Sequence, residues 1–191
     1  MTSLEMDSDS TLSQNLESSA APTHLFWGMD PTFKLSEVLA YSQSESRKWR
    51  EWLAKNPAAL GVKLEIAQAT SAALLVQHIV AVDLRYAERL LGEPVTPYEK
   101  LPTDAAGLFA VADSAFAKLR TYLDSASEED WKTVVEFPTR SAGTLKASKK
   151  KMFIHTLLHS VRHWAQLATA LRTAGFKQDW QHDFLMSEVM E

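Results

Sequence analysis

Three of the six histidines of this 191-residue chain stand at four-residue intervals in the stretch HTLLHSVRHWAQ, residues 155–166. Neighbours at i and i+4 share one face of a helix and lie about 6 Å apart along its axis, so their imidazoles can converge on one ion. His155 and His163 would be about 12 Å apart, which is too far for both to bind the same ion. The spacing therefore predicts a metal site on either His155/His159 or His159/His163.

A helical projection distinguishes the two pairs. The projected buried stripe consists of Phe153, Ile154, Leu157, Leu158, Val161, Trp164, Ala165 and Ala168. The residues around the azimuth of His155 are Lys151, Arg162 and Thr173. His155 therefore leans towards solvent, whereas His163 lies on the shoulder of the buried stripe. The projection favours His159 and His163 as the pair.

A pair of histidines needs further ligands, and the remaining histidines are His24, His78 and His182. His78 is the best placed, because it stands in the middle of a predicted helix. Its apolar neighbours are Leu75, Val76, Ile79 and Val82. A histidine in such a setting is either a core residue with its hydrogen bonds satisfied or an inward-facing ligand, and we favour the ligand. Three imidazoles would leave a coordination position open, as in catalytic zinc sites.

Several other chemistries lack the residues they need. The zincin pattern requires a glutamate between its two histidines, but residues 160–162 are Ser, Val and Arg. The chain has no cysteine, which excludes disulfides, thiolate ligands and a cysteine nucleophile. It also lacks a Gly-rich phosphate loop, a G-x-S-x-G elbow and a dinucleotide fingerprint. ATP, serine hydrolase and nicotinamide chemistry therefore have no support.

Apolar residues at three- and four-residue spacing predict four long helices. They cover residues 34–56, 64–94, 104–126 and about 150–174. Expected boundary signals are Asp30 with Pro31, Thr103 as a cap, Gly92 with Pro94, and Gly175 as a left-handed C-cap. With no alternating strand and no repeat, the pattern predicts an all-α four-helix bundle whose topology stays open.

Composition sets the domain organisation. Residues 1–22 are rich in serine and carry four acids and no bases, which predicts a disordered tail before a domain over residues 23–191. A net charge of −4 argues against nucleic acid as a partner. No apolar run approaches the roughly 18 residues of a membrane span, so we expect no membrane partner and a cytoplasmic protein.

Two segments outside the helices could matter. The connection over residues 124–150 contains Ser127 as a cap for a short helix, then Pro138 and Gly143 as breakers. Connections longer than about 12–15 residues tend to be functional, although this one could simply cover the end of the bundle. Residues 179–190 are expected to form a short amphipathic element that docks back.

The histidine pattern is similar to that of the DinB/YfiT-like proteins, in which a histidine of the second helix is followed some eighty residues later by H-x3-H-x2-[HR]-H-x2-Q. The matching residues are His78, His155, His159, Arg162, His163 and Gln166. The resemblance covers roughly residues 30–190. It implies a four-helix bundle with a metal triad at His78, His159 and His163, and a divalent ion such as nickel or zinc.

The chain departs from the commonest family pattern beside the triad. Arg162 stands where a histidine is often found, and Trp164-Ala165 replaces a frequent Arg-Gly. The resemblance implies a metal-dependent thiol transferase, an isomerase that uses a low-molecular-weight thiol, or a hydrolase. It does not select one of these reactions.

The first hypothesis is therefore a metal-dependent enzyme that acts on a small molecule. Gln166 is a weaker candidate to support a ligand, and a surface glutamine is the favoured interpretation of it. The second is a non-catalytic bundle that binds a metal or ligand, or pairs with itself as a homodimer. Haem ligation is a third possibility. Two groups of residues are expected to have no role in the chemistry: Asp83 and Glu88 as surface acids, and Trp49, Trp52 and Trp131 as core or a dimer seam.

Overall fold

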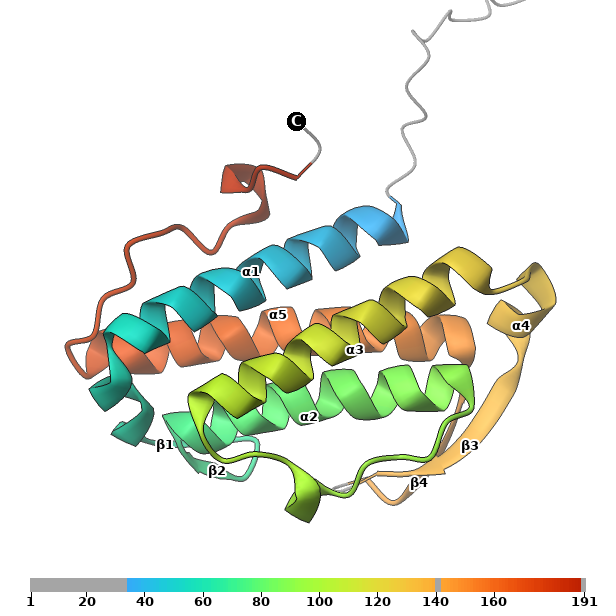
Figure 1. Cartoon of the computed structure of the whole chain (residues 1–191), viewed down its shortest axis with the longest axis horizontal. Helices are drawn as coiled ribbons and strands as arrows, with labels where there is room; N and C mark the ends of the chain where they lie inside the picture. Colours follow the sequence, from blue (N-terminus) through green and yellow to red (C-terminus); the bar gives the residue numbers. More distant parts are fainter. Residues whose placement is uncertain (1–33, 140–141, 190–191) are drawn as a thin grey trace, which may run out of the picture. The chain divides into compact units, whose positions relative to one another are not determined.

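Four long helices make up most of the described part of the chain, residues 34–139 and 142–189 of a computed structural model (Figure 1). They are α1 (Leu35–Lys55), α2 (Ala72–Leu91), α3 (Ala105–Ser125) and α5 (Lys149–Thr173). Helices α1 and α2 each pack against both α3 and α5. The predicted all-α bundle is confirmed. The expected tail over residues 1–22 and the Asp30–Pro31 signal lie outside the described residues, and the domain boundary at residue 23 stays a prediction.

Short polar side chains set where the helices begin. Ser71 accepts a hydrogen bond from the Leu74 backbone N–H at the start of α2, and Ser148 does the same for Lys151 at the start of α5. The expected cap at Thr103 is wrong by one residue. Asp104 caps α3 instead, because its extended backbone lets the carboxylate accept from the Gly107 N–H at 2.8 Å.

Glycines end two helices as predicted. Gly92 after α2 and Gly175 after α5 have φ values of 72° and 90°, in the left-handed region that favours glycine. Beyond Gly175, the Phe176 N–H donates to the Leu171 carbonyl at 2.9 Å and closes the last turn of α5.

Two small hairpins were not predicted. Strands β1 (Lys63–Ile66) and β2 (Ala69–Ser71) occupy the part of the chain expected to begin the second helix. Ala67 and Gln68 turn the chain with φ values of 50° and 67°. Both residues are ordinary helix formers, so the turn carries no Asn or Gly signal and the helical prediction is wrong there.

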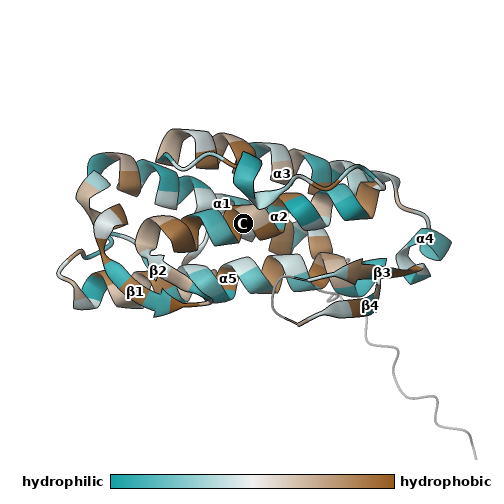
Figure 2. Ribbon diagram, turned by 90° about the horizontal axis from the view of Figure 1, so that it is seen from below, coloured by the Kyte–Doolittle hydropathy of each residue, from teal (hydrophilic) through white to brown (hydrophobic). Residues whose placement is uncertain are grey.

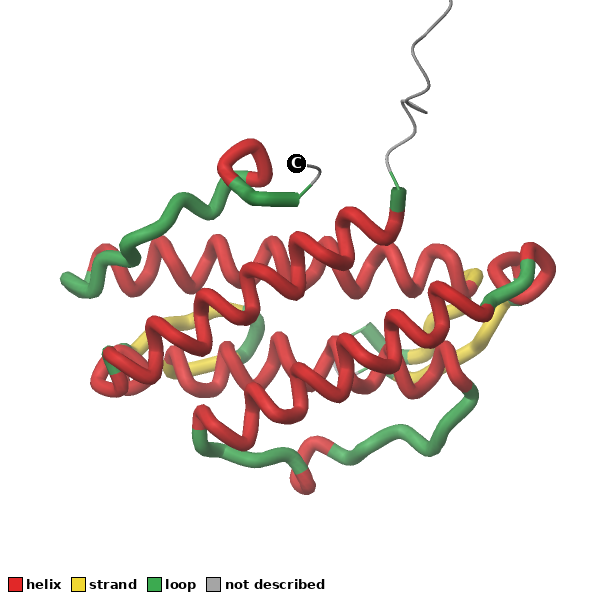
Figure 3. Tube along the Cα trace, turned by 45° about the horizontal axis from the view of Figure 1, so that its top comes forward, coloured by secondary structure: helices red, strands yellow, loops and turns green. Residues whose placement is uncertain are grey.

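The second hairpin lies in the long connection before α5. A short helix, α4 (Glu128–Lys132), is capped by Ser127 as predicted. Strand β3 (Val134–Pro138) then pairs antiparallel with β4 (Thr144–Ser148). Figure 3 shows both hairpins in yellow, and Figures 1 and 2 place them towards opposite ends of α5.

Apolar and polar residues alternate along the helices in Figure 2, as expected for amphipathic elements. The buried face of α5 is rotated from the projected stripe, because it includes Ser160 and Leu167 while Leu158 is 59% exposed. The largest fully buried side chains are Trp49, Phe109, Phe153, Leu39, Leu53, Leu75, Ile79, Leu90, Leu108, Leu119, Met152 and Leu157.

The chain after α5 returns along α1, as predicted for the C-terminal segment. The Tyr41 hydroxyl donates to the His182 carbonyl at 2.9 Å, and the Tyr41 and Phe184 rings meet edge to face. The His182 ring stacks on Trp49 with centroids 5.2 Å apart. Trp49 and Trp52 are core residues, which agrees with their expected structural role. No helix in residues 34–139 or 142–189 is long and apolar enough to cross a membrane.

Candidate metal centre

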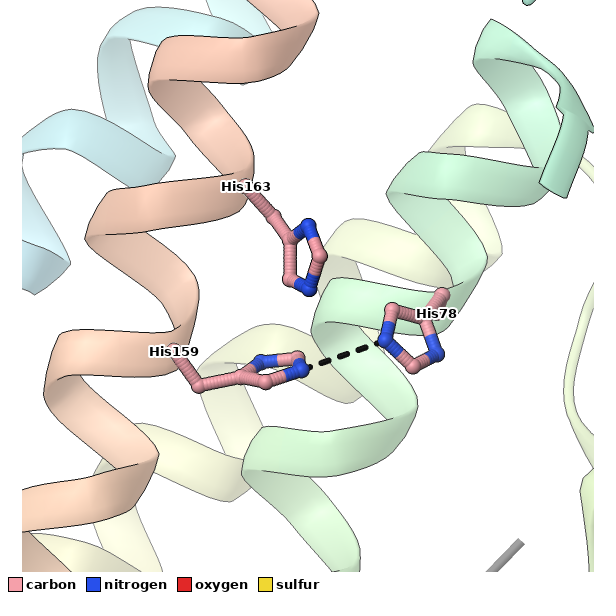
Figure 4. Close-up of side chains that lie close together, drawn as sticks. All are labelled: His78, His159 and His163. Carbon is pink, nitrogen blue, oxygen red and sulfur yellow. Dashed lines mark hydrogen bonds between the residues drawn. The ribbon is translucent and has the colours of Figure 1, made fainter. Parts of the chain in front are cut away.

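His78 on α2 faces His159 and His163 on α5, and these three residues are called the histidine triad below (Figure 4). One ring nitrogen from each residue can be chosen so that all three lie within 4.8 Å of one another. The Nε2 atoms of His78 and His159 are 3.1 Å apart. Two helices that are far apart in sequence therefore bring three nitrogen ligands to one point.

Antiparallel packing of α2 and α5 produces this meeting. His78 faces His163 with ring centroids 5.1 Å apart, and two turns further along α2, Tyr86 faces His155 at 5.4 Å. Residue numbers thus rise along α2 as they fall along α5. The four-residue spacing of His159 and His163 places their rings 4.3 Å apart on the same face.

Burial keeps His159 and His163, the two triad residues on α5, uncharged at neutral pH. Loss of solvent lowers the pKa of His159 to about 2, with smaller contributions from His163, His78, His155 and Arg162. Burial also lowers the pKa of His163, although its hydrogen bond with Gln166 acts in the opposite direction. Neutral imidazoles have the lone pair that a metal ion requires.

Gln166 decides which nitrogen of His163 carries that lone pair. The Gln166 side-chain oxygen lies 2.6 Å from His163 Nδ1 and can only accept, so Nδ1 must carry the proton. The unprotonated Nε2 then points towards the other two histidines (Figure 4) and accepts from the Arg162 guanidinium at 3.3 Å, a contact that an ion bound at Nε2 would displace. Gln166 thus contacts one of the three predicted ligands, while its role in supporting metal binding stays a prediction.

The triad fits a divalent ion. Two nitrogens bound to zinc at ~2.1 Å with tetrahedral angles are about 3.4 Å apart, and the spacings here need only small side-chain rotations to match this. A second observation agrees: Nδ1 of His159 is buried and has no hydrogen-bond partner among the described residues, so it does not restrain which way the ring turns. A site made only of imidazole nitrogens suits zinc or nickel.

The other histidines lie outside the triad. His155 is exposed, as predicted, and its ring centroid is 5.6 Å from that of His159. His182 pairs with Glu45 beside α1, where its Nδ1 lies 2.8 Å from a carboxylate oxygen. His24 is outside the described residues. The structure therefore brings together the three predicted ligands, while metal binding by them stays a prediction.

The expectation that Asp83 and Glu88 are surface acids is wrong. Asp83 is 3% exposed and accepts a hydrogen bond of 2.5 Å from Ser160, which directly follows a residue of the triad. Burial raises the pKa of Asp83 to about 7, and the Ser160 hydrogen bond only partly offsets this. Glu88 is also buried and accepts from the backbone and hydroxyl of Thr96. The helical period places both acids on the buried face of α2, so the period predicts their burial better than their residue type does.

A cavity of about 370 Å³ adjoins the triad. Residues of α2 and α5 line its base. The first hairpin contributes Ala67 and Gln68 to its wall, and the second contributes Pro138, Thr139, Ala142 and Leu145. The full lining is Ala67, Gln68, His78, Val82, Arg85, Tyr86, Arg89, Tyr98, Pro138, Thr139, Ala142, Leu145, His155, His159, Arg162 and His163. The volume suits a small molecule. The long connection before α5 thus forms part of the cavity wall. The cavity is also lined by Arg85, Arg89 and Arg162, which the sequence analysis did not single out as lining a pocket.

Fold and site together define a helical bundle with a candidate metal centre between two antiparallel helices. The DinB family model matches residues 29–188, and the chain belongs to this family. The fold of this chain is similar to the crystal structure of a DinB-like protein, YjoA, from Bacillus subtilis, with a TM-score of 0.54 and 16% sequence identity. That similarity covers 78% of this chain and 96% of the other. Comparison with curated proteins found no match.

Proposed function

We propose that the protein is a metal-dependent enzyme that acts on a small molecule, with a divalent ion held by His78, His159 and His163. The observation that carries the proposal is the convergence of three ring nitrogens beside a cavity of about 370 Å³. A structural metal site is normally closed by a fourth protein ligand. Among the described residues, no cysteine or carboxylate joins the triad, which supports a site open to substrate.

The residues around the triad have separate tasks. The antiparallel helices hold the three imidazoles, and Gln166 keeps the proton of His163 on Nδ1. The buried hydrogen bond from Ser160 to Asp83 ties α5 to α2 close to the triad. A divalent ion held by these three histidines would lower the pKa of a water or thiol bound to it and would polarise an electrophilic oxygen. This chemistry serves a thiol transferase, an isomerase that uses a low-molecular-weight thiol, or a hydrolase.

We include zinc and nickel as the candidate ions, because neutral imidazole ligands suit both. A non-catalytic bundle that binds a metal is the alternative function, and the same triad supports it. The described cavity favours the enzyme, since a purely structural site has no need for an adjoining pocket of substrate size. A homodimer and a cytoplasmic location stay predictions.

Calorimetric titration of the metal-free full-length protein with Zn²⁺ and with Ni²⁺ tests the site. We expect one ion per chain, and loss of that binding in His159→Ala. His155→Ala is the matched control, because this residue lies on the same helix face but outside the triad. If His159→Ala binds metal as tightly as the parent, the proposal is wrong.

Turnover then separates the enzyme from the alternative. The metal-loaded protein is tested against a panel of thiols paired with electrophiles and against ester substrates. We expect activity that disappears on chelation and in His159→Ala. Tight metal binding without turnover of any substrate class would support the non-catalytic bundle.

A further inference from the structure

Three arginines line the cavity beside the triad. Arg85 and Arg89 lie one turn apart on α2, and Arg162 lies on α5; they are called the arginine cluster below. No Asp or Glu is present among the described residues that line this cavity. A substrate that enters it therefore meets three positive charges and no negative one.

Two of these side chains are held in place by the chain around them. The Arg85 guanidinium donates to the Thr96 carbonyl and lies over the Tyr98 ring, 5.0 Å from its centroid. Arg89 donates to the Pro138 carbonyl at 3.3 Å and lies 5.3 Å from the Phe137 ring centroid. Since a guanidinium has five N–H donors, these contacts orient each group and leave donors for a ligand.

The charges of the cluster are not neutralised by the described residues, because no ion pair there involves any of its members. The nearby Glu88 carboxylate is occupied by two hydrogen bonds with Thr96. Partial burial, followed by the charge of Arg85, lowers the pKa of Arg89. Arg85 and Arg89 are two like charges held close together in a half-buried setting, and an anion between them would relieve their repulsion.

The position of the cluster relates the anion to the triad. Arg85 is seven residues beyond His78 on α2, which is about 10 Å along the helix axis. Arg162 is closer, since one of its terminal nitrogens lies 3.3 Å from His163 Nε2. An anionic group at Arg85 and Arg89 would thus be several bonds away from the atoms that reach the triad.

We propose that the cavity binds a small organic carboxylate, with the carboxylate group at Arg85 and Arg89 and the reacting group at the histidine triad beside Arg162. This inference rests on the proposed function and names its substrate class. Guanidinium groups match a planar carboxylate through paired hydrogen bonds. Phosphate sites commonly recruit backbone amides at a helix N-terminus, whereas both arginines lie well inside α2, so a carboxylate is the better match.

A matched pair of ligands tests this on the full-length, zinc-loaded protein. The probes are 6-mercaptohexanoate and 6-mercaptohexan-1-ol, which share the thiol and the spacer and differ in the carboxylate. We expect the acid to bind about 10-fold or more tightly than the alcohol, as charge-assisted hydrogen bonds would give. Equal affinities would overturn the inference while leaving the metal site intact.

Variants assign the preference to the cluster. In the double variant Arg85→Gln, Arg89→Gln, the acid should lose its advantage over the alcohol, with zinc stoichiometry and helical circular dichroism unchanged. Arg172→Gln is the control, since this arginine is exposed on α5 and outside the cavity. If the double variant folds and the acid keeps its advantage, the assignment is wrong. If it does not fold, the single variants Arg85→Lys and Arg89→Lys, which keep charge without the paired geometry, should each weaken only the acid.

The failure of this inference is distinguishable from that of the proposed function. Zinc titration reports on the triad alone, whereas the difference between acid and alcohol reports on the arginines. If zinc does not bind, the proposed function fails. Hexanoate and hexan-1-ol on the unloaded protein then show whether the arginine cluster still selects the carboxylate, and equal affinities there overturn it.

Discussion

At the scale of single residues, the site depends on which ring nitrogen of each histidine is protonated. His163 illustrates this, because its Nδ1 proton is held by Gln166 at 2.6 Å, which leaves Nε2 unprotonated as a metal ligand must be. Outer hydrogen bonds of this kind typically change metal affinity by 10- to 100-fold.

Gln166→Ala should therefore weaken zinc binding by about 10- to 100-fold without changing the fold. Gln166→Glu should retain tight binding, because its carboxylate can accept the same proton. Competition with a chromogenic chelator measures both affinities. Unchanged affinity in Gln166→Ala would show that the hydrogen bond does not orient the ligand.

The buried Asp83 gives a second prediction, concerning pH. Its folded pKa of about 7 exceeds the ordinary value of 3.8, so between about pH 4 and pH 7 the folded protein holds a proton that the unfolded chain has released. Stability from this residue is full at low pH and is lost as the pH rises through that window. The histidines, whose pKa values shift downwards, act in the opposite direction but are present in both proteins compared.

Asp83→Asn removes the titration while keeping an oxygen for Ser160. As the pH rises from 5 to 8, the free energy of unfolding of the variant should increase relative to that of the parent by roughly 2–3 kcal/mol. Urea unfolding of the metal-free proteins measures this difference. Asp124→Asn, on the exposed surface of α3, should show no such gain. A constant difference between Asp83→Asn and its parent across this range would contradict the buried-acid interpretation.

Sequence reasoning identified much of the site at this scale, but not all of it. The spacing of His159 and His163 and the apolar surroundings of His78 are local, so they can be read directly. The partners Asp83 and Ser160 are 77 positions apart, and their contact depends on how α2 packs on α5. The arginine cluster likewise becomes visible only when two helices and two hairpins meet.

Among the helices, the start of α3 has a position where the neighbouring residues leave room only for glycine. Gly107 lies in the first turn of α3, where alanine would normally favour the helix by about 1 kcal/mol. An added Cβ would however lie 2.6 Å from Pro102 Cβ, and the proline ring cannot rotate away.

Gly107→Ala should therefore destabilise the protein by about 1–3 kcal/mol, as overpacking does, instead of stabilising it. Gly61→Ala is the matched control, because nothing lies within 4 Å of its added Cβ, and it should be nearly neutral. Chemical denaturation measures both changes. A stabilising Gly107→Ala would mean that residues 102–107 do not pack as described.

The four long helices were predictable from apolar spacing, whereas the hairpins were not. The Ala67–Gln68 turn uses residues with high helix propensity in a left-handed conformation, so local preference is overridden by the packing around it. Strand β3 alternates exposed and covered residues, but its five residues include an exposed Val134 and a terminal proline, so the sequence does not show the alternation clearly. Strand β4 is mostly exposed and has no alternation in its burial.

At the scale of the whole molecule, the triad joins α2 to α5, two of the four bundle helices. An ion bound only by the folded protein stabilises it by about 2.7 kcal/mol at a free concentration 100 times its dissociation constant. For a chain of this size, that corresponds to a rise in Tm of roughly 5–10 °C.

Zinc should raise the Tm of the parent and of His155→Ala by this amount, and excess chelator should reverse it. His78→Ala should show no rise, because one ligand from α2 is needed to join the two helices. Differential scanning calorimetry measures the shift. An equal rise in His78→Ala would place the bound ion elsewhere.

The proposed function depends on imidazoles from α2 and α5 sharing one ion. Anomalous diffraction at the zinc absorption edge, from crystals grown with zinc, tests it most directly. We expect one strong peak about 2.0–2.3 Å from a ring nitrogen of each of His78, His159 and His163. Zinc-containing crystals whose strong anomalous peaks all lie away from these three residues would contradict it.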